Sequence, residues 1–336
     1  MTPAPRLVRA WLWGVVALIL AMTLVGGTTR LTGSGLSMVE WRPLMGALPP
    51  MSEAQWLDLF RKYQQTPQYQ LVNSWMTLAD FERIFFWEYL HRLLGRFIGL
   101  AVALPLLGFW LTGRLNGALA RRGVGLLVLG GLQGLLGWFM VKSGLVDVPE
   151  VSHLRLAAHL LLAFAIAQAT VWVALDAGRD GPPERGARRF LGFIAGVAAL
   201  VVAQIGWGAF MAGLRAGTYA ATFPDLNGVY APWRLVGSGG YLHDMVFEVP
   251  LVHWTHRVLG TAALLAVWGL AAALRCHQAL RAPALTAAVL VTLQYALGVA
   301  TVMSHVAIPV AVAHQAGAYA LLCCLTWAAH RAWWGR

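Results

Sequence analysis

Eight long apolar stretches divide the 336-residue sequence and constrain its fold more than any other feature. Each is close to the roughly 20 residues that an α-helix needs to cross a bilayer. Only helices and closed barrels satisfy their backbone hydrogen bonds in lipid, and barrel strands are far shorter. The sequence therefore predicts an all-α integral membrane protein with eight transmembrane helices. We place them at about 11–30, 85–111, 124–141, 154–175, 190–212, 250–274, 283–303 and 309–330.

The composition and the charge distribution agree with a membrane location. Hydrophobic residues make up 59% of the chain and charged residues 12%, whereas soluble domains carry about a quarter charged residues. With a cytoplasmic amino terminus, the cytoplasmic segments hold 13 of the 25 basic residues and 3 of the 14 acidic ones. The positive-inside rule thus explains the net charge of +11. We expect both termini in the cytoplasm and no nucleic-acid binding.

The first apolar segment resembles a signal peptide, because Arg6 and Arg9 precede it. No small-residue cleavage site followed by a soluble domain is evident, so we expect this segment to remain as a helix. The three cysteines, Cys276, Cys323 and Cys324, lie in or beside apolar segments and form no CxxC motif. We expect no disulfide framework, and we interpret Cys323 and Cys324 as packing residues.

Three polar segments interrupt the apolar pattern. The expected outer segments at 31–84 and 213–249 are long, and 178–189 has the composition of a cytoplasmic linker. In the first outer segment, Ser52 is expected to cap a short helix, with Gln55 at the capping-box position.

The linker separates two halves, 1–177 and 190–336, that repeat each other. The matched motifs are His-Arg-apolar-Leu-Gly at 91–95 and 256–260, Leu-Gln at 132–133 and 293–294, and Ala-His at 158–159 and 313–314. Each half is therefore predicted to be a four-helix bundle. Because four helices return the chain to the same side, the two bundles enter the membrane in the same direction, as in a parallel repeat.

The repeat divides the ten histidines into two groups. His91, His159, His256 and His314 have a histidine partner in the other half, and they lie on the second and fourth helix of each half. The others lack one, and a lone histidine in a helix is more often a packing residue; these are His153, His243, His253, His277, His305 and His330. Ionisable residues at lipid depth are costly and usually functional, so the paired set indicates a site.

Two inward-facing imidazoles per bundle suit the axial positions of a haem iron. Arg92 and Arg257 directly follow their histidines, and a guanidinium can hold a haem propionate through two hydrogen bonds. A zinc site is less suited, because no thiolate or carboxylate set completes a tetrahedron. We therefore expect His91 and His159 to bind one haem, and His256 and His314 another.

Glu88 breaks the symmetry between the halves. It lies three residues before His91, on the same helix face, and its counterpart before His256 is His253. One interpretation makes Glu88 a structural partner of Arg92 or of a nearby histidine. The other makes it the reactive group at the edge of the first haem, where a carboxylate could accept a proton, orient water or stabilise a developing cation.

The residues alone leave three functions open. The first is an enzyme that modifies one of its haems. The second is a dihaem, b-type membrane electron-transfer subunit, which gives Glu88 no chemical task. The third is a haem carrier or assembly factor without catalysis.

Several motifs resemble those of the haem A synthase family, and the likeness covers almost the whole chain. The motifs are Gly27–Ser37, Leu48–Pro50, Asn73–Thr77, Glu88–Arg92, Ala212–Gly217 and Ala313–Gly317. The long first outer segment resembles the mitochondrial and proteobacterial branch. Another branch carries a cysteine pair in an outer loop, which this sequence lacks, so a thiol relay there is not available.

The resemblance implies an oxidoreductase of the inner membrane. It would oxidise the C8 methyl group of haem O to a formyl group, by successive hydroxylations and loss of water, and so supply haem A to cytochrome c oxidase. By resemblance, His91 and His159 hold the substrate haem, His256 and His314 hold a permanent haem b, and Glu88 is the catalytic carboxylate. A haem O synthase and cytochrome c oxidase assembly factors are the implied partners, and a homo-oligomer is compatible with this function.

Overall fold

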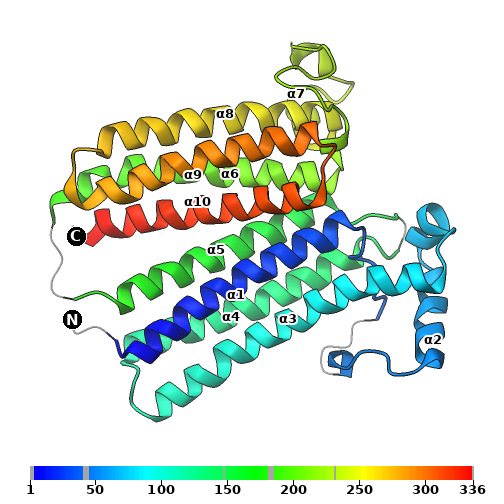
Figure 1. The fold of residues 1–336 in the computed structure, drawn as a ribbon, viewed down its shortest axis with the longest axis horizontal. Helices are drawn as coiled ribbons and strands as arrows, with labels where there is room; N and C mark the ends of the chain where they lie inside the picture. Colours follow the sequence, from blue (N-terminus) through cyan, green and yellow to red (C-terminus); the bar gives the residue numbers. More distant parts are fainter. Residues whose placement is uncertain (1–3, 41–44, 147, 181–184, 231, 335–336) are drawn as a thin grey trace.

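Eight long helices form the body of the molecule in the computed structural model, which describes residues 4–40, 45–146, 148–180, 185–230 and 232–334 (Figure 1). They are α1 (Arg6–Leu31), α3 (Leu78–Leu111), α4 (Gly117–Lys142), α5 (His153–Ala177), α6 (Leu191–Gly213), α8 (Val249–Leu274), α9 (Gln278–Met303) and α10 (Ile308–Trp334). Each is long and apolar enough to cross a membrane, and the described ranges contain no β-strand. The predicted all-α architecture and the eight predicted spans are therefore confirmed.

Most of the helices extend beyond the predicted spans, and a polar side chain caps the start of α3, α4 and α5. The largest differences are in α3 and α4, which begin seven residues before the predicted positions 85 and 124. Thr77 caps α3 by accepting a hydrogen bond from the Asp80 N–H, and the Asp80 side chain accepts one from the Thr77 N–H in return. An apolar run marks only the part of a helix that lies in the hydrocarbon core. The helix itself begins where a partner accepts hydrogen bonds from its first N–H groups.

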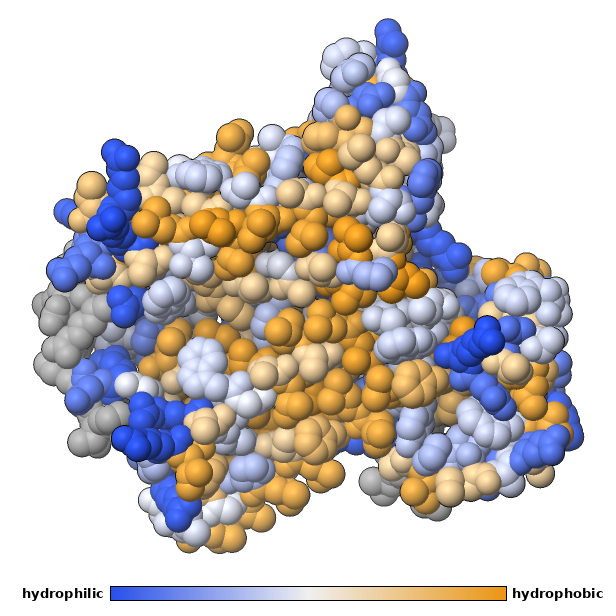
Figure 2. All heavy atoms as spheres, viewed as in Figure 1, coloured by the Kyte–Doolittle hydropathy of each residue, from blue (hydrophilic) through white to orange (hydrophobic). Residues whose placement is uncertain are grey.

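The helices lie side by side in two groups (Figure 1). α1, α3, α4 and α5 lie together, and so do α6, α8, α9 and α10; α5 packs against α6 and α10, and α1 against α10. Both ends of the chain lie at one end of the helices, here called the termini side, and α2 and α7 lie at the other, the loop side. Figure 2 shows apolar side chains over the middle of the helices and hydrophilic ones at both ends, as expected for a chain in a bilayer.

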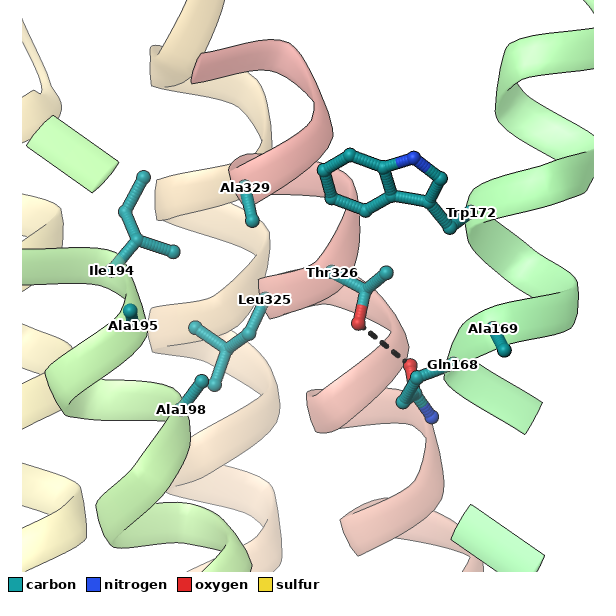
Figure 3. Close-up of a pocket in the computed structure, with 9 residues that line it drawn as sticks. All are labelled: Gln168, Ala169, Trp172, Ile194, Ala195, Ala198, Leu325, Thr326 and Ala329. Carbon is teal, nitrogen blue, oxygen red and sulfur yellow. Dashed lines mark hydrogen bonds between the residues drawn. The ribbon is translucent and has the colours of Figure 1, made fainter. Parts of the chain in front are cut away.

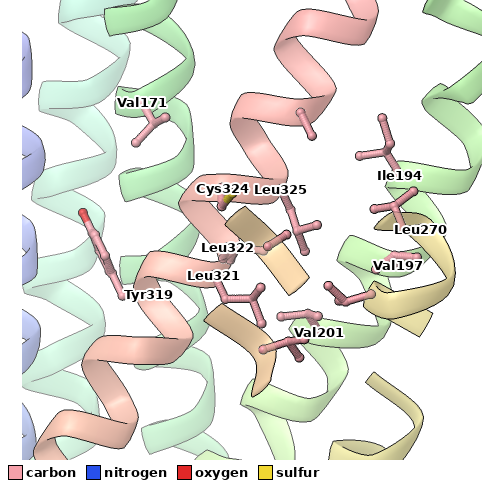
Figure 4. Packing of buried hydrophobic residues seen from close by; sticks show 14 of the residues in the cluster. Val171, Ile194, Val197, Val201, Leu270, Tyr319, Leu321, Leu322, Cys324 and Leu325 are labelled. Atoms are coloured by element: carbon pink, nitrogen blue, oxygen red, sulfur yellow. The ribbon is translucent and has the colours of Figure 1, made fainter. Parts of the chain in front are cut away.

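The largest buried apolar cluster lies where the two groups meet (Figure 4). Its members include residues of α1, α3, α5, α6, α8, α9 and α10, among them Val171, Ile194, Leu270, Leu322 and Leu325. The Tyr319 hydroxyl, on α10, donates to the Val16 carbonyl on α1 at 2.9 Å, so this contact also ties the groups together by a buried hydrogen bond. Cys324 is buried in the same cluster, which agrees with the packing role expected for it.

A cavity of about 340 Å³ interrupts this packing between α5, α6 and α10 (Figure 3). Thr326 donates a hydrogen bond of 2.8 Å to the Gln168 side chain across it. None of the four paired histidines lines the cavity. It is therefore a gap at the junction between the helix groups, separate from the histidines.

A single carboxylate joins three helices on the termini side. Asp176, on α5, accepts hydrogen bonds from His330 Nε2 and Trp334 Nε1 on α10, each at 2.9 Å, and from Arg122 Nη1 on α4 at 2.5 Å. His330 thus has a structural role, as its lack of a repeat partner indicated. The expected linker 178–189 follows directly, and its residues 181–184 lie outside the described ranges, as does Arg336.

The outer segments form short helices on the loop side. They are η1 (Met45–Ala47), α2 (Glu53–Gln64), the π-helical turn η2 (Tyr69–Asn73), η4 (Ala216–Thr218), η5 (Pro232–Leu235) and α7 (Tyr241–Phe247), while η3 (Arg185–Phe190) precedes α6. The predicted short helix is α2, and Ser52 caps it by accepting from the Gln55 N–H. The Gln55 side chain accepts from the N–H of Met51 rather than from that of Ser52, so the predicted capping box is displaced by one residue.

The α2 segment contacts the start of α3 and the turn after α1. Tyr63 is fully buried and stacks on Phe81 with ring centroids 5.2 Å apart. The Tyr63 hydroxyl donates to Gln68 Oε1 at 3.0 Å and accepts from Asn73 at 2.7 Å, and Gln68 Nε2 donates to the Gly33 carbonyl at 3.0 Å. This buried polar chain links the outer segment to the turn that follows α1.

Tyr63→Phe is expected to loosen the outer segment. The substitution leaves two buried polar partners unsatisfied, a cost of about 1 kcal/mol or more. Burial raises the pKa of the Tyr63 phenol. The neutral phenol therefore contributes its full stability below the ordinary tyrosine pKa of about 10, and that contribution is lost as the pH rises further. Protease cleavage of the 31–84 segment should accelerate at high pH in the wild type, and less so in Tyr63→Phe.

The matched control is Tyr230→Phe, since Tyr230 is an exposed tyrosine of the other outer segment. It should cleave at the wild-type rate at every pH. Equal cleavage of all three proteins between pH 8 and 11 would contradict the role given to Tyr63.

Candidate functional site

The four repeat-related histidines come together in two pairs. His91 on α3 and His159 on α5 lie within electrostatic reach of each other, and so do His256 on α8 and His314 on α10. Each imidazole is half-buried inside its group of helices. Within each group, the structure thus brings the histidine of the second long helix close to the histidine of the fourth.

A glycine of a neighbouring helix faces every one of these imidazoles. A Cβ atom on that glycine would lie within 3.2 Å of the ring, which is closer than ordinary van der Waals contact. The pairs are Gly26 on α1 with His91, Gly137 on α4 with His159, Gly208 on α6 with His256, and Gly298 on α9 with His314. Only glycine lets the helix backbone approach the ring so closely. Of the four, Gly137 and Gly298 are equivalent in the repeat, both standing four residues after a matched glutamine.

Glutamine side chains contact two of these rings and a main-chain carbonyl contacts a third, roles that the sequence analysis did not assign. Gln133 Nε2 lies 3.1 Å from His159 Nδ1 and 3.0 Å from the His159 carbonyl. Gln204 Nε2 lies 3.3 Å from His256 Nε2, and His314 Nδ1 lies 3.1 Å from the carbonyl of Gln294. Gln133 is matched in the repeat by Gln294, and its polarity at lipid depth was the signal that could have identified it. Gln204 is also polar at lipid depth but has no counterpart among the matched motifs.

The two arginines bind the outer loops. Arg92 donates to the carbonyls of Met38 at 2.8 Å and Glu40 at 3.0 Å, in the loop after α1. Arg257 donates to the carbonyls of Asp225 at 2.5 Å and Pro224 at 3.3 Å, in the segment after α6. Each arginine therefore fastens the loop that closes its own half on the loop side.

The two arginines differ in what remains available for a ligand. In Arg257, Nε and Nη2 are buried without a hydrogen-bond partner among the described residues. In Arg92, Nη2 also donates to Glu88 Oε1 at 2.5 Å. A buried donor without a partner is costly and suits an anionic ligand such as a haem propionate.

Glu88 is buried and held by three donors. Its Oε2 accepts from the Ser37 hydroxyl and from the Met38 N–H, both at 2.7 Å, and its Oε1 accepts from Arg92. The side chain is 3% exposed. The structural partnership with Arg92 is therefore present, and the carboxylate lies one helical turn before His91. Its counterpart His253 is fully buried.

The donor set fits a haem better than a bare metal ion. The described residues hold no group of three or more His, Cys, Asp or Glu side chains that could surround an ion. Two imidazoles per half, within electrostatic reach of each other, instead agree in number with the two axial positions of a haem iron. His256 Nδ1 and the Oε1 atoms of Gln133 and Gln294 are buried without hydrogen-bond partners among the described residues, so polar groups near the histidines remain suited to a ligand.

The chain matches the family described as cytochrome oxidase assembly protein over residues 9–326. It is 43% identical over 336 residues to the heme A synthase of Rhodospirillum centenum, a match that covers 97% of this chain and 88% of that protein. The heme A synthase of Maricaulis maris is 43% identical over 337 residues, covering 97% of both chains. That of Brucella ovis is 46% identical over 262 residues, covering 77% of this chain and 72% of that protein.

Gly298→Leu is expected to remove haem from the α8–α10 pair alone. The leucine side chain would occupy the space of the His314 ring and displace the ring from the position in which it could bind a haem iron. The purified protein should therefore retain about half of the two haems per chain that four axial histidines can bind, measured by pigment extraction and the Soret absorbance.

Gly269→Leu is the matched control, because the position is on α8 and has open space around it. It should retain full haem content. A Gly298→Leu protein with unchanged haem content would show that the close approach of α9 has no bearing on the site.

Proposed function

The chain belongs to the COX15-CtaA family of cytochrome oxidase assembly proteins, and we propose that it oxidises haem O to haem A, supplying this haem to cytochrome c oxidase. The observation that carries the proposal is that each group of helices brings two histidines within electrostatic reach of each other, while one buried carboxylate, Glu88, lies one helical turn before His91 and has His253 as its counterpart in the second group. The b-type electron-transfer alternative finds no support, because the relatives named above are heme A synthases.

We assign the two halves different tasks. Residues 1–177 and 190–336 are taken as two repeated four-helix bundles, joined by the linker 178–189. The first binds substrate haem O between His91 and His159. The second binds haem b between His256 and His314, and this haem would transfer electrons when bound.

The arginines support this division of tasks. Arg257 keeps buried N–H groups without partners among the described residues, as suits the propionate of a haem that stays. Arg92 is already engaged with the loop carbonyls and with Glu88. A substrate that enters and leaves in every cycle is better served by a site whose charges are balanced in its absence.

The reaction oxidises the C8 methyl group of haem O to a formyl group through successive hydroxylations and loss of water. His91 and His159 hold and orient the substrate, and the glycine contacts of both rings fix their direction. Written with water as the source of oxygen, each hydroxylation releases two protons and two electrons; Glu88 would take up one proton at Oε2, and an external electron acceptor would take the electrons. The loop held by Arg92 covers this half and limits the access of water from the loop side.

The same reasoning sets the surroundings of the protein. We place both termini in the cytoplasm and the chain in the inner membrane, because the basic residues gather on the termini side. A haem O synthase supplies the substrate, and cytochrome c oxidase assembly factors receive the product. Contacts between copies of the chain as a homo-oligomer belong to the same proposal.

Variants of the first half are expected to lose product while the second half keeps its haem. Cells or membranes supplied with haem O and expressing His91→Ala or Glu88→Gln should form haem A at less than a tenth of the wild-type rate, as for loss of a catalytic acid–base group. Extracted pigments are separated to quantify haem O, the hydroxylated intermediate and haem A.

His256→Ala is the comparison for the second half. It should lose haem b absorbance and, through the loss of electron transfer, product formation as well. Unimpaired haem A production in both Glu88→Gln and His91→Ala would disprove the assignment of the site, and two bound haems of unchanged chemistry in the wild type would disprove the function.

A further inference from the structure

We propose that Ser37 is the positioning residue that allows Glu88 to take up and hold a proton during the oxidation. The inference rests on the proposed function and extends it to a side chain outside the histidine pairs. It follows from the way three donors share the two oxygens of the Glu88 carboxylate.

Ser37 is placed firmly against Glu88. The serine is 2% exposed, and its hydroxyl donates to Glu88 Oε2 at 2.7 Å. The turn after α1 fixes its position, because the Ser37 N–H donates to the Ser34 carbonyl at 3.1 Å and the Ser34 N–H donates to the Thr29 carbonyl at 2.9 Å. The contact therefore belongs to an ordered turn that continues directly from α1.

Among the partners of Glu88 in the described part of the chain, Ser37 is the one that suits both protonation states. The Met38 N–H and the Arg92 guanidinium can only donate, so they favour the carboxylate. A protonated carboxyl needs an acceptor for its own O–H, and a serine hydroxyl can accept as well as donate. When Oε2 receives a proton, that O–H donates to Ser37 Oγ, and the serine O–H rotates away from the carboxyl.

The charges around Glu88 explain why the hydrogen bond between Ser37 and Glu88 must be able to reverse its direction. Arg92 lies against the carboxylate, and Tyr63 of α2 lies within electrostatic reach of it. Glu40, in the same loop, is paired with Lys62 at 3.0 Å. Since Arg92 can only donate, a proton taken up by Glu88 needs another neighbour to accept its hydrogen bond. The second half has His253 in place of Glu88, so this arrangement is confined to the substrate half.

The test compares Ser37→Ala with two matched variants in the full-length protein supplied with haem O. Ser37→Ala should lower kcat about tenfold or more, the value of one hydrogen bond to a charged group, with the KM for haem O and the Soret absorbance unchanged. Ser37→Thr keeps the hydroxyl and should restore the rate to near the wild-type value. Ser34→Ala removes an equally buried hydroxyl of the same turn that does not contact Glu88, and should have no effect.

A second readout needs no turnover. Infrared difference spectra recorded while haem-free protein is acidified should contain a protonated-carboxyl band that is absent in Glu88→Gln. This band should move in Ser37→Ala and return to its wild-type position in Ser37→Thr.

The outcomes separate this inference from the proposed function. Loss of turnover in Glu88→Gln with wild-type turnover and an unmoved band in Ser37→Ala would overturn the role of Ser37 alone. A loss of haem binding in Ser37→Ala, or no rescue by Ser37→Thr, would make the serine a purely structural residue. Wild-type turnover in Glu88→Gln would overturn the proposed role of the carboxylate itself.

Discussion

The close approach of a helix backbone to each of four imidazole rings is the contact on which the rest of the site depends. A glycine on α1, α4, α6 or α9 faces each ring, and these four helices are the ones that carry no paired histidine. Each histidine-bearing helix is therefore packed against a neighbour that fixes the direction of its ring. Axial ligation demands such preorganisation, because a ring that turns away cannot hold an iron between two nitrogens.

The two halves share an arrangement of helices but differ in the charges around their arginines. In both, the arginine after the first histidine fastens the adjoining outer loop through main-chain carbonyls. In the first half a carboxylate completes the arrangement and balances the arginine charge, whereas in the second the arginine retains buried donors without partners among the described residues. A charge that is balanced within the protein costs less to keep when a ligand departs. The two guanidinium groups therefore differ in how they are satisfied, in keeping with the different tasks proposed for the two halves.

The eight spans could be predicted from the sequence because lipid imposes one simple rule on every residue between two interfaces. The paired histidines could be predicted because the repeat supplied an internal comparison. The hydrogen bonds around Glu88 could not, since Ser37 and Glu88 are 51 positions apart and only tertiary packing brings them together. The same holds for the contact between Gln204 on α6 and His256 on α8, because only the packing of these two helices brings the side chains together. The displaced contact of Gln55 arises from loop geometry, which local motifs describe only approximately.

The chain of buried hydrogen bonds from Asn73 through Tyr63 and Gln68 to Gly33 ends in the turn that carries Ser37. Gly33 adopts a left-handed backbone conformation, which glycine takes up without steric cost. The chain of hydrogen bonds from α2 therefore supports the turn whose residues Ser37 and Met38 contact Glu88. A protein that binds α2 on the loop side would therefore shift this turn and, with it, the position of Ser37 against Glu88.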